Sequence, residues 1–217
     1  MKTQKTDVVV YDKKFLQDVS NLGMRGVDPL DIRPPQILLI QASSDASSFK
    51  TIKDESPAIG QYFHTGRNEI MDTFECFFLL AAKGKYMDKN KTPPEERDQY
   101  RTIGCMTDDL KPFMMNFRSS ALYALSPLFT AVASLGRPMF SLKVMLETKE
   151  LQNSVGKKWR IPVVRIVGPE TDDSVLNNLY NLALSYDSNT AKFVADKEDE
   201  PELEAGEDEA TEDKMPF

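Results

Sequence analysis

Cysteine, histidine and tryptophan are scarce in this chain of 217 residues, and each scarcity excludes a class of site. The two cysteines, Cys76 and Cys105, lack CxxC spacing, which favours free thiols in a reducing compartment over a disulfide framework or a zinc site. The single histidine, His64, belongs to no catalytic motif. We therefore expect no metal, no cofactor and no enzyme activity. A nuclease that uses the scattered carboxylates is the alternative.

Long apolar runs are missing as well. No stretch approaches the roughly 20 apolar residues of a membrane helix, and the N-terminus has no apolar run of signal-peptide length. We therefore expect a cytoplasmic protein without a membrane partner. The apolar content of 41% fits an ordinary globular domain with its own core.

Negative charge is concentrated at one end of the chain. From Val194 onward there are eleven acidic residues and two lysines, a local charge of −9, and because the whole chain carries −7, residues 1–193 carry +2. This asymmetry favours a polyanion-binding body with an acidic interaction tail, while a purely solubilising tail is the alternative. We predict an N-terminal extension over 1–34, a folded domain over 35–190 and a disordered acidic tail over 191–217.

Hydrophobic patterning predicts a mainly β domain. Strands are expected at 36–43, 72–82, 139–148 and 159–167, with a bent strand or a strand pair over 100–106 and 112–118. The polar stretch 83–98, "KGKYMDKNKTPPEERD", is expected to be a loop. Asn153 and Gly156 mark a hairpin tip before the last strand.

Two helices are expected in the second half of the chain. Apolar residues recur every three or four positions over 120–135, with Ser126 and Pro127 as a helix start and Gly136 as its stop. A second helix is expected over 172–186, with Asp172 or Asp173 as its N-cap. Three strands, a helix and a final hairpin are the order of an OB-fold β-barrel, although other small barrels and α+β sheets share this order.

Cations alternate with aromatic residues near the predicted loops. This combination is typical of single-strand binding, because bases stack on aromatic rings while phosphates attract positive charge. The alternative is that the aromatics are core and the lysines a solvated rim. The candidate nucleic-acid contacts are Tyr62, Arg67, Lys83, Lys85, Tyr86, Arg101, Lys157, Lys158, Trp159 and Arg160.

The chain ends in "EDEATEDKMPF", which resembles the C-terminal tip of bacterial single-stranded DNA-binding proteins. In that family an acidic run precedes a short ending of an apolar residue, proline and phenylalanine, here Met215, Pro216 and Phe217. The chain departs from that pattern at Lys214, where an aspartate is usual. In size and plan the body is similar to phage replicative single-stranded DNA-binding proteins, which combine an OB-fold, an acidic tail and a terminal aromatic residue.

The resemblance implies a protein that binds and protects single-stranded DNA with little sequence preference during replication, recombination and repair. It also implies recruitment of a polymerase, helicase or primase, or recombinase through Glu212, Asp213 and residues 215–217, and location in the host-cell cytoplasm if the chain is phage-encoded. The alternative is an acidic-tailed phage interaction or assembly protein whose body binds protein. RNA binding and homo-oligomerisation stay open.

Overall fold

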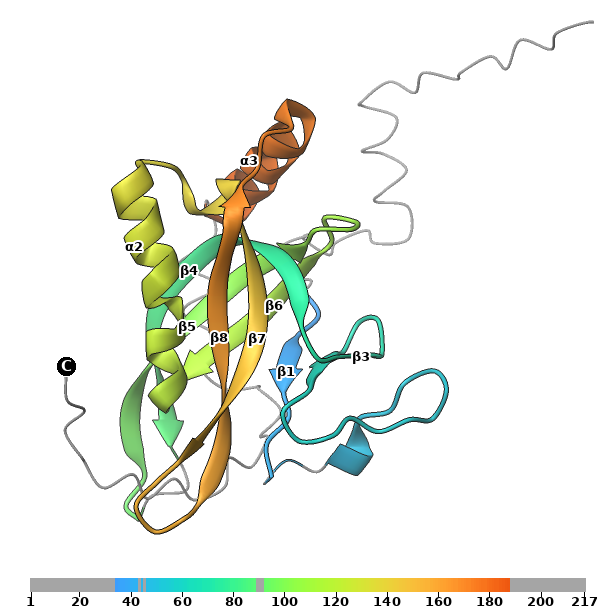
Figure 1. Cartoon of the computed structure of the whole chain (residues 1–217), viewed down its shortest axis with the longest axis vertical. Helices are drawn as coiled ribbons and strands as arrows, with labels where there is room; N and C mark the ends of the chain where they lie inside the picture. The colour runs from blue at the N-terminus through green and yellow to red at the C-terminus, as the bar shows by residue number, and fades with distance from the viewer. Residues whose placement is uncertain (1–33, 43, 45, 89–91, 188–217) are drawn as a thin grey trace, which may run out of the picture. The chain divides into compact units, whose positions relative to one another are not determined.

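The computed structural model describes residues 34–42, 44, 46–88 and 92–187. The chain divides between Arg33 and Pro34 into two units, and the described residues all belong to the second. They form a mainly β fold with two helices, which confirms the predicted fold class (Figure 1). The predicted N-terminal extension and acidic tail lie outside the described residues, apart from Pro34 at the end of the extension.

Five antiparallel strands form the main sheet, in the order β6-β5-β4-β7-β8. Their bounds are β4 Phe74–Asp88, β5 Glu95–Met106, β6 Pro112–Arg118, β7 Leu142–Gln152 and β8 Lys158–Pro169. The first three strands in sequence form a meander, and β7 and β8 form a hairpin that joins β4 through β7. This topology is consistent with an OB-like fold in which the two edge strands, β6 and β8, are not paired with each other.

The segment between β6 and β7 contains the first helix. A 3₁₀ stretch, η2 (Ser119–Leu125), leads into α2 (Ser126–Leu135), with Pro127 in its first turn and Gly136 at a φ of 60° after its last. Proline lacks the N–H that a first helical turn leaves unpaired, and glycine adopts the left-handed conformation without strain, so this helix begins and ends where predicted. A short 3₁₀ turn, η3 (Met139–Ser141), precedes β7.

A second, three-stranded sheet was not expected from the sequence. It consists of β1 (Ile37–Leu39), β2 (Tyr62–His64) and β3 (Glu69–Met71), with η1 (Ala46–Ser48) between the first two strands. A parallel bridge between Gln36 and Met114 connects the start of β1 with β6. Only the first of these strands was predicted, because three-residue strands are too short to show a clear hydrophobic period.

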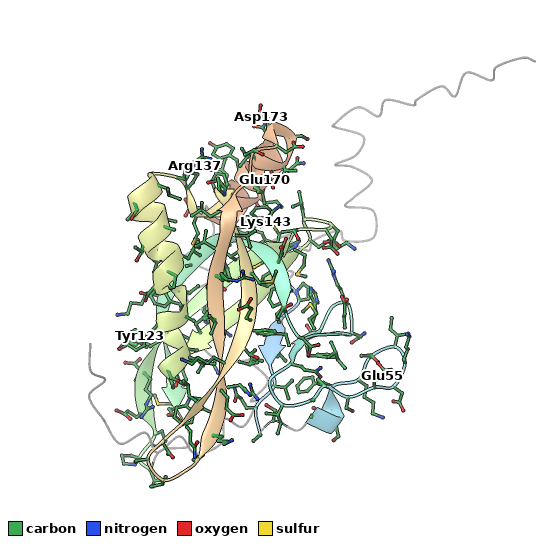
Figure 2. The ribbon with its side chains drawn as sticks, viewed as in Figure 1. Glu55, Tyr123, Arg137, Lys143, Glu170 and Asp173 are labelled. Atoms are coloured by element: carbon green, nitrogen blue, oxygen red, sulfur yellow. The ribbon has the colours of Figure 1, made fainter. Side chains whose placement is uncertain are left out.

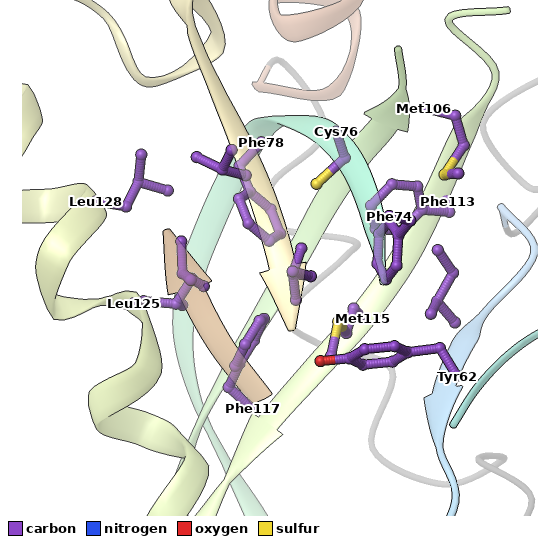
Figure 3. Packing of buried hydrophobic residues seen from close by; sticks show 14 of the residues in the cluster. Tyr62, Phe74, Cys76, Phe78, Met106, Phe113, Met115, Phe117, Leu125 and Leu128 are labelled. Atoms are coloured by element: carbon purple, nitrogen blue, oxygen red, sulfur yellow. The ribbon is translucent and has the colours of Figure 1, made fainter. Parts of the chain in front are cut away.

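The core inside the curved main sheet combines aromatic and aliphatic residues (Figure 3). Phe74, Phe78, Phe113 and Phe117 meet in edge-to-face contacts, with ring centroids 5.8 to 6.5 Å apart. Edge-to-face pairs place the positive ring edge against the negative ring face and add to the hydrophobic gain of burial. Leu128 of α2 is fully buried in the same cluster, so this helix covers the core.

The second helix, α3 (Asp173–Asp187), packs on the other face of β4 and β5. Its Leu179 is fully buried in a cluster that includes Phe77, Ile103 and Cys105. The Asp172 carboxylate accepts the backbone N–H groups of Ser174 and Val175, which confirms one of the two predicted N-caps. Figure 1 shows α3 at one end of the main sheet and the turn of the β7–β8 hairpin at the other.

The predicted loop over 83–98 was wrong. Strand β4 continues to Asp88 and β5 begins at Glu95, so most of this polar stretch is a regular hairpin in which, for example, Lys85 lies opposite Asp98. Cross-strand pairs of opposite charge stabilise such a ribbon. The polarity of neighbouring residues in the sequence does not show these pairs, because the partners lie on different strands. The hairpin tip predicted at Asn153 and Gly156 is confirmed, since Gly156 has a φ of 85° and its N–H donates to the Asn153 carbonyl.

Candidate nucleic-acid interface

Two aromatic side chains from different hairpins are fixed on adjacent serines. The Tyr86 hydroxyl, on β4, lies 2.8 Å from Ser119 Oγ. The Trp159 indole N–H, on β8, donates to Ser120 Oγ at 3.2 Å. Both rings are half-buried, so each keeps some exposed surface. Two residues 73 positions apart in the sequence thus meet at the start of η2.

An arginine that the sequence did not indicate completes this cluster. The Arg118 guanidinium lies 4.8 Å from the centroid of the Tyr86 ring, and its Nε donates to Gln99 Oε1 at 2.9 Å. Gln99 is buried and donates from Nε2 to the Lys85 carbonyl at 3.1 Å. These contacts hold a cation against an aromatic face. The only local signal for Arg118 was a cation at the end of a predicted strand.

The backbone at this junction is unusual. Ser119 has a φ of 48°, in the left-handed region that residues with a side chain seldom occupy. Its hydroxyl contact with Tyr86 and the turn from β6 into η2 hold it there. Strained residues of this kind gather at functional sites, and this one directs both serines toward the aromatic rings.

The predicted cations of the first hairpin are paired with acid. Lys83 Nζ lies 2.9 Å and Lys85 Nζ 2.6 Å from the carboxylate oxygens of Asp98. Hydrogen bonds from Lys85 and then Lys83 lower the pKa of Asp98, while the bond to Asp98 raises the pKa of Lys83. The carboxylate is therefore ionised at neutral pH, and two exposed ammonium groups share one negative charge.

The second hairpin repeats this arrangement. Lys158 Nζ lies 2.9 Å and Arg160 Nη2 3.0 Å from the carboxylate oxygens of Glu150, and the hydrogen bond from Lys158 lowers the pKa of that carboxyl. Lys157 is exposed in the turn, where its backbone N–H donates to Asn153 Oδ1. The predicted cations thus lie beside Trp159, and two of the three share a carboxylate.

Arg160 is also held from the side of the small sheet. The Gln41 carboxamide donates from Nε2 to the Arg160 carbonyl at 2.6 Å and accepts its backbone N–H at 3.0 Å. A Cβ on Gly60 would lie 3.2 Å from the Arg160 side chain, so the absence of a side chain there lets the two segments approach. The Gln41 carboxamide thus satisfies the backbone N–H and carbonyl of Arg160, as a neighbouring strand would at the edge strand β8.

Three of the predicted contact residues lie elsewhere. Tyr62 is fully buried on β2 and its hydroxyl donates to the Glu147 carbonyl at 2.7 Å, so the prediction that it contacts DNA was wrong. Arg67 belongs to the β2–β3 turn, where it donates to both carboxylate oxygens of Asp108. Arg101 is only 8% exposed within the main sheet, so little of its side chain is open to the predicted contact with DNA.

Among residues 34–42, 44, 46–88 and 92–187, no group of three or more histidine, cysteine or acidic side chains is placed to hold a metal ion. Within the same residues, neither helix is long and apolar enough to cross a membrane. The predicted partner-binding residues Glu212, Asp213, Met215, Pro216 and Phe217 lie outside the described part of the chain. The chain matches no protein-family model, and no curated protein or solved structure shows significant similarity to it.

Proposed function

We propose that this protein binds and protects single-stranded DNA with little sequence preference, at the surface where its two long hairpins meet. The observation that carries this proposal is the fixing of Tyr86 and Trp159 on the adjacent serines Ser119 and Ser120, beside the cations of both hairpins. Replication, recombination and repair are the processes in which such a protein acts. RNA is the competing ligand.

The chemistry of the site suits an unpaired strand. Every base has an apolar face, so a ring fixed in position can stack on any base, and each stacked base contributes about 1 to 3 kcal/mol. The Arg118 guanidinium beside Tyr86 adds a second flat, cationic surface. Phosphates attract the exposed cations without regard to sequence, so the combination favours affinity over base readout.

The position of the site within the fold supports the same ligand. In OB-like barrels, oligonucleotides lie across the second and third strands and the loops that join strands 1 to 2 and 4 to 5. The corresponding parts of this chain are β5, β6 and the turns of the β4–β5 and β7–β8 hairpins. Tyr86 and Trp159 belong to these two hairpins, and Arg118 ends β6.

The acidic C-terminal segment is the proposed recruiter of partner proteins. A terminal aromatic ring suits an apolar pocket, and the acidic residues before it steer encounters with a basic rim. Residues 215–217 and the acidic pair Glu212 and Asp213 would make this contact with a polymerase, helicase, primase or recombinase. This proposal rests on the sequence of the segment.

Trp159 gives a direct test because it is the only tryptophan. We expect its emission to fall on titration with oligo-dT, and we expect the W159A variant to bind labelled oligo-dT about 5- to 150-fold more weakly, the equivalent of one lost base stack. The W159F variant, which keeps a ring, is expected to bind at an intermediate level. Thermal unfolding checks that each variant folds.

Tyr123 supplies the matched control. It is an aromatic residue on the same η2 segment and is 69% exposed (Figure 2), whereas Tyr86 and Trp159 are fixed on Ser119 and Ser120, so Y123A should leave binding unchanged. Full affinity of a folded W159A variant would remove Trp159 from the site. A wild-type protein that binds no oligo-dT over a range of salt would refute the proposed function, and competition with oligo-rU distinguishes DNA from RNA.

A further inference from the structure

Each long hairpin directs two cations at one carboxylate. Lys83 and Lys85 lie two positions apart on β4 and both contact Asp98 of β5. Lys158 and Arg160 lie two positions apart on β8 and both contact Glu150 of β7. In both hairpins one cation is directly opposite the acid, Lys85 to Asp98 and Arg160 to Glu150, and the other is on the diagonal.

Alternation along a strand explains the geometry. Residues two apart share a face, so both cations of a pair point to the same side of the ribbon, where the acid of the partner strand also lies. The nitrogen to oxygen distances are 2.6 to 3.0 Å in all four contacts. A phosphodiester group also carries one negative charge, and it accepts charge-assisted hydrogen bonds of similar length from lysine and arginine.

We infer that these two clusters are phosphate sites, in which Asp98 and Glu150 occupy the place that a DNA phosphate takes on binding. The inference rests on the proposed function and identifies the part of the site that binds the phosphate backbone of the DNA. It assigns the two carboxylates a role in limiting affinity, since a phosphate must displace them from their cations before it gains their charge.

The exposure of the clusters allows such an exchange. The Asp98 and Glu150 side chains are 35% and 38% exposed, and the lysines of both clusters are more exposed than the acids. Ion pairs this close to water are weak, because solvent screens the attraction and long side chains lose freedom in the pair. Exchanging one anion for another on the same cations therefore gives little net gain, and the acid keeps DNA affinity low.

Neutralising the acids tests the inference. We expect D98N and E150Q each to bind labelled oligo-dT more tightly than the wild type at low salt. Each freed pair of cations offers about one more net positive charge, so the slope of log K against log salt should steepen by about 0.7 per variant. Between about 50 and 200 mM salt, this slope means an extra threefold loss of affinity. The double variant should show both effects.

E147Q is the matched control. Glu147 lies on the same strand as Glu150, its side chain has the same exposure of 38%, and it contacts Arg165 one to one. The substitution removes the same charge from the molecule, so it should change binding much less than E150Q. Equal tightening by E147Q would mean that bulk charge alone acts, and it would overturn the inference.

The D98N and E150Q variants test the two clusters independently. Because D98N and E150Q lie in different hairpins, a variant that fails to fold leaves the other to decide. Unchanged or weaker binding by folded variants, with a wild-type protein that does bind oligo-dT, would show that the acids order the cations or take no part, and would refute the inference alone. Absence of wild-type binding would refute the proposed function instead.

Discussion

At the scale of single residues, His64 illustrates how burial controls ionisation. Its Nδ1 accepts the backbone N–H groups of Gly66 and Arg67, both at 3.2 Å, and the side chain is buried. Burial lowers the pKa of His64 from its usual 6.5, and the positive charge of Arg67 lowers it further, against smaller opposing effects that include the carboxylate of Glu69. The folded state therefore holds this side chain neutral.

This lowered pKa predicts a loss of stability in mild acid. Above pH 6.5 the histidine is neutral in both states, whereas below it the unfolded chain takes up a proton that the folded chain refuses. The free energy of unfolding should fall by about 1.4 kcal/mol per pH unit from pH 6.5 down to the lowered pKa. Urea unfolding of the wild type at a series of pH values measures this fall.

The H64N variant isolates the effect, because an asparagine oxygen can accept the same N–H groups but does not titrate in this range. We expect H64N to lose less stability than the wild type between pH 6.5 and the lowered pKa. Asp108 does not interfere, because its hydrogen bond from Arg67 lowers its pKa below 3.8 and its contribution is lost only in stronger acid. Parallel pH profiles of the two proteins would contradict the assignment.

Residue by residue, the sequence identified the exposed part of the site better than its supports. Trp159 and Tyr86, both named as candidate contacts from the sequence, are half-buried and keep some exposed surface. Tyr62 lies between Gln61 and Phe63 in the sequence and is buried, because its ring packs against Phe74 with the centroids 5.1 Å apart, which is a tertiary contact. Gln99 and Ser119 gave no signal, since their roles depend on side chains from other strands.

At the scale of elements, close packing within the main sheet depends on one glycine. Gly104 of β5 lies opposite Phe78 of β4 and Phe113 of β6. A Cβ at this position would lie 2.6 Å from the Phe113 ring and 2.8 Å from the Phe77 carbonyl oxygen. The ladder also shifts register between Phe78 and Leu80, and a bulge of this kind bends a strand.

Replacing Gly104 with alanine should therefore be costly. We expect G104A to lower the free energy of unfolding by about 1 to 3 kcal/mol, because the new methyl group must displace backbone or a packed ring. G84A is the control: Gly84 lies on β4 in the same ladder, and its Cβ would meet nothing within 4 Å. Urea unfolding compares the two, and equal losses would show that the contacts at Gly104 are not limiting.

Elements with a local signal were predicted and elements that depend on pairing were not. Both helices show an apolar period and a cap, and the β7–β8 tip has its own turn residues, so the chain near each one specifies it. The outer part of the β4–β5 hairpin is rich in charged residues, and the partners of Lys83 and Lys85 lie across the ribbon. The β2 and β3 strands are three residues each, and they depend on pairing: β2 pairs with β1, and β3 pairs with β2.

At the scale of the whole molecule, charge is divided between a mildly basic body and an acidic segment. Residues 1–193 carry +2 and residues 194–217 carry −9. Many cations of the described body are already paired with carboxylates, including those of both hairpins. We expect a tethered segment with this charge to compete with a DNA strand for the same cations, because tethering raises its effective concentration.

Two truncations separate this competition from partner docking. Removing residues 194–217 should tighten binding to oligo-dT at low salt, and the gain should fade as added salt shortens the Debye length below about 10 Å. Deleting only residues 215–217 leaves the charged side chains in place, so DNA affinity should hardly change while binding to a partner polymerase, helicase or recombinase is lost. Titrations with oligo-dT and pull-downs with purified partners measure the two effects. If the three-residue deletion still binds every partner of the full chain, the apolar tip has no docking role.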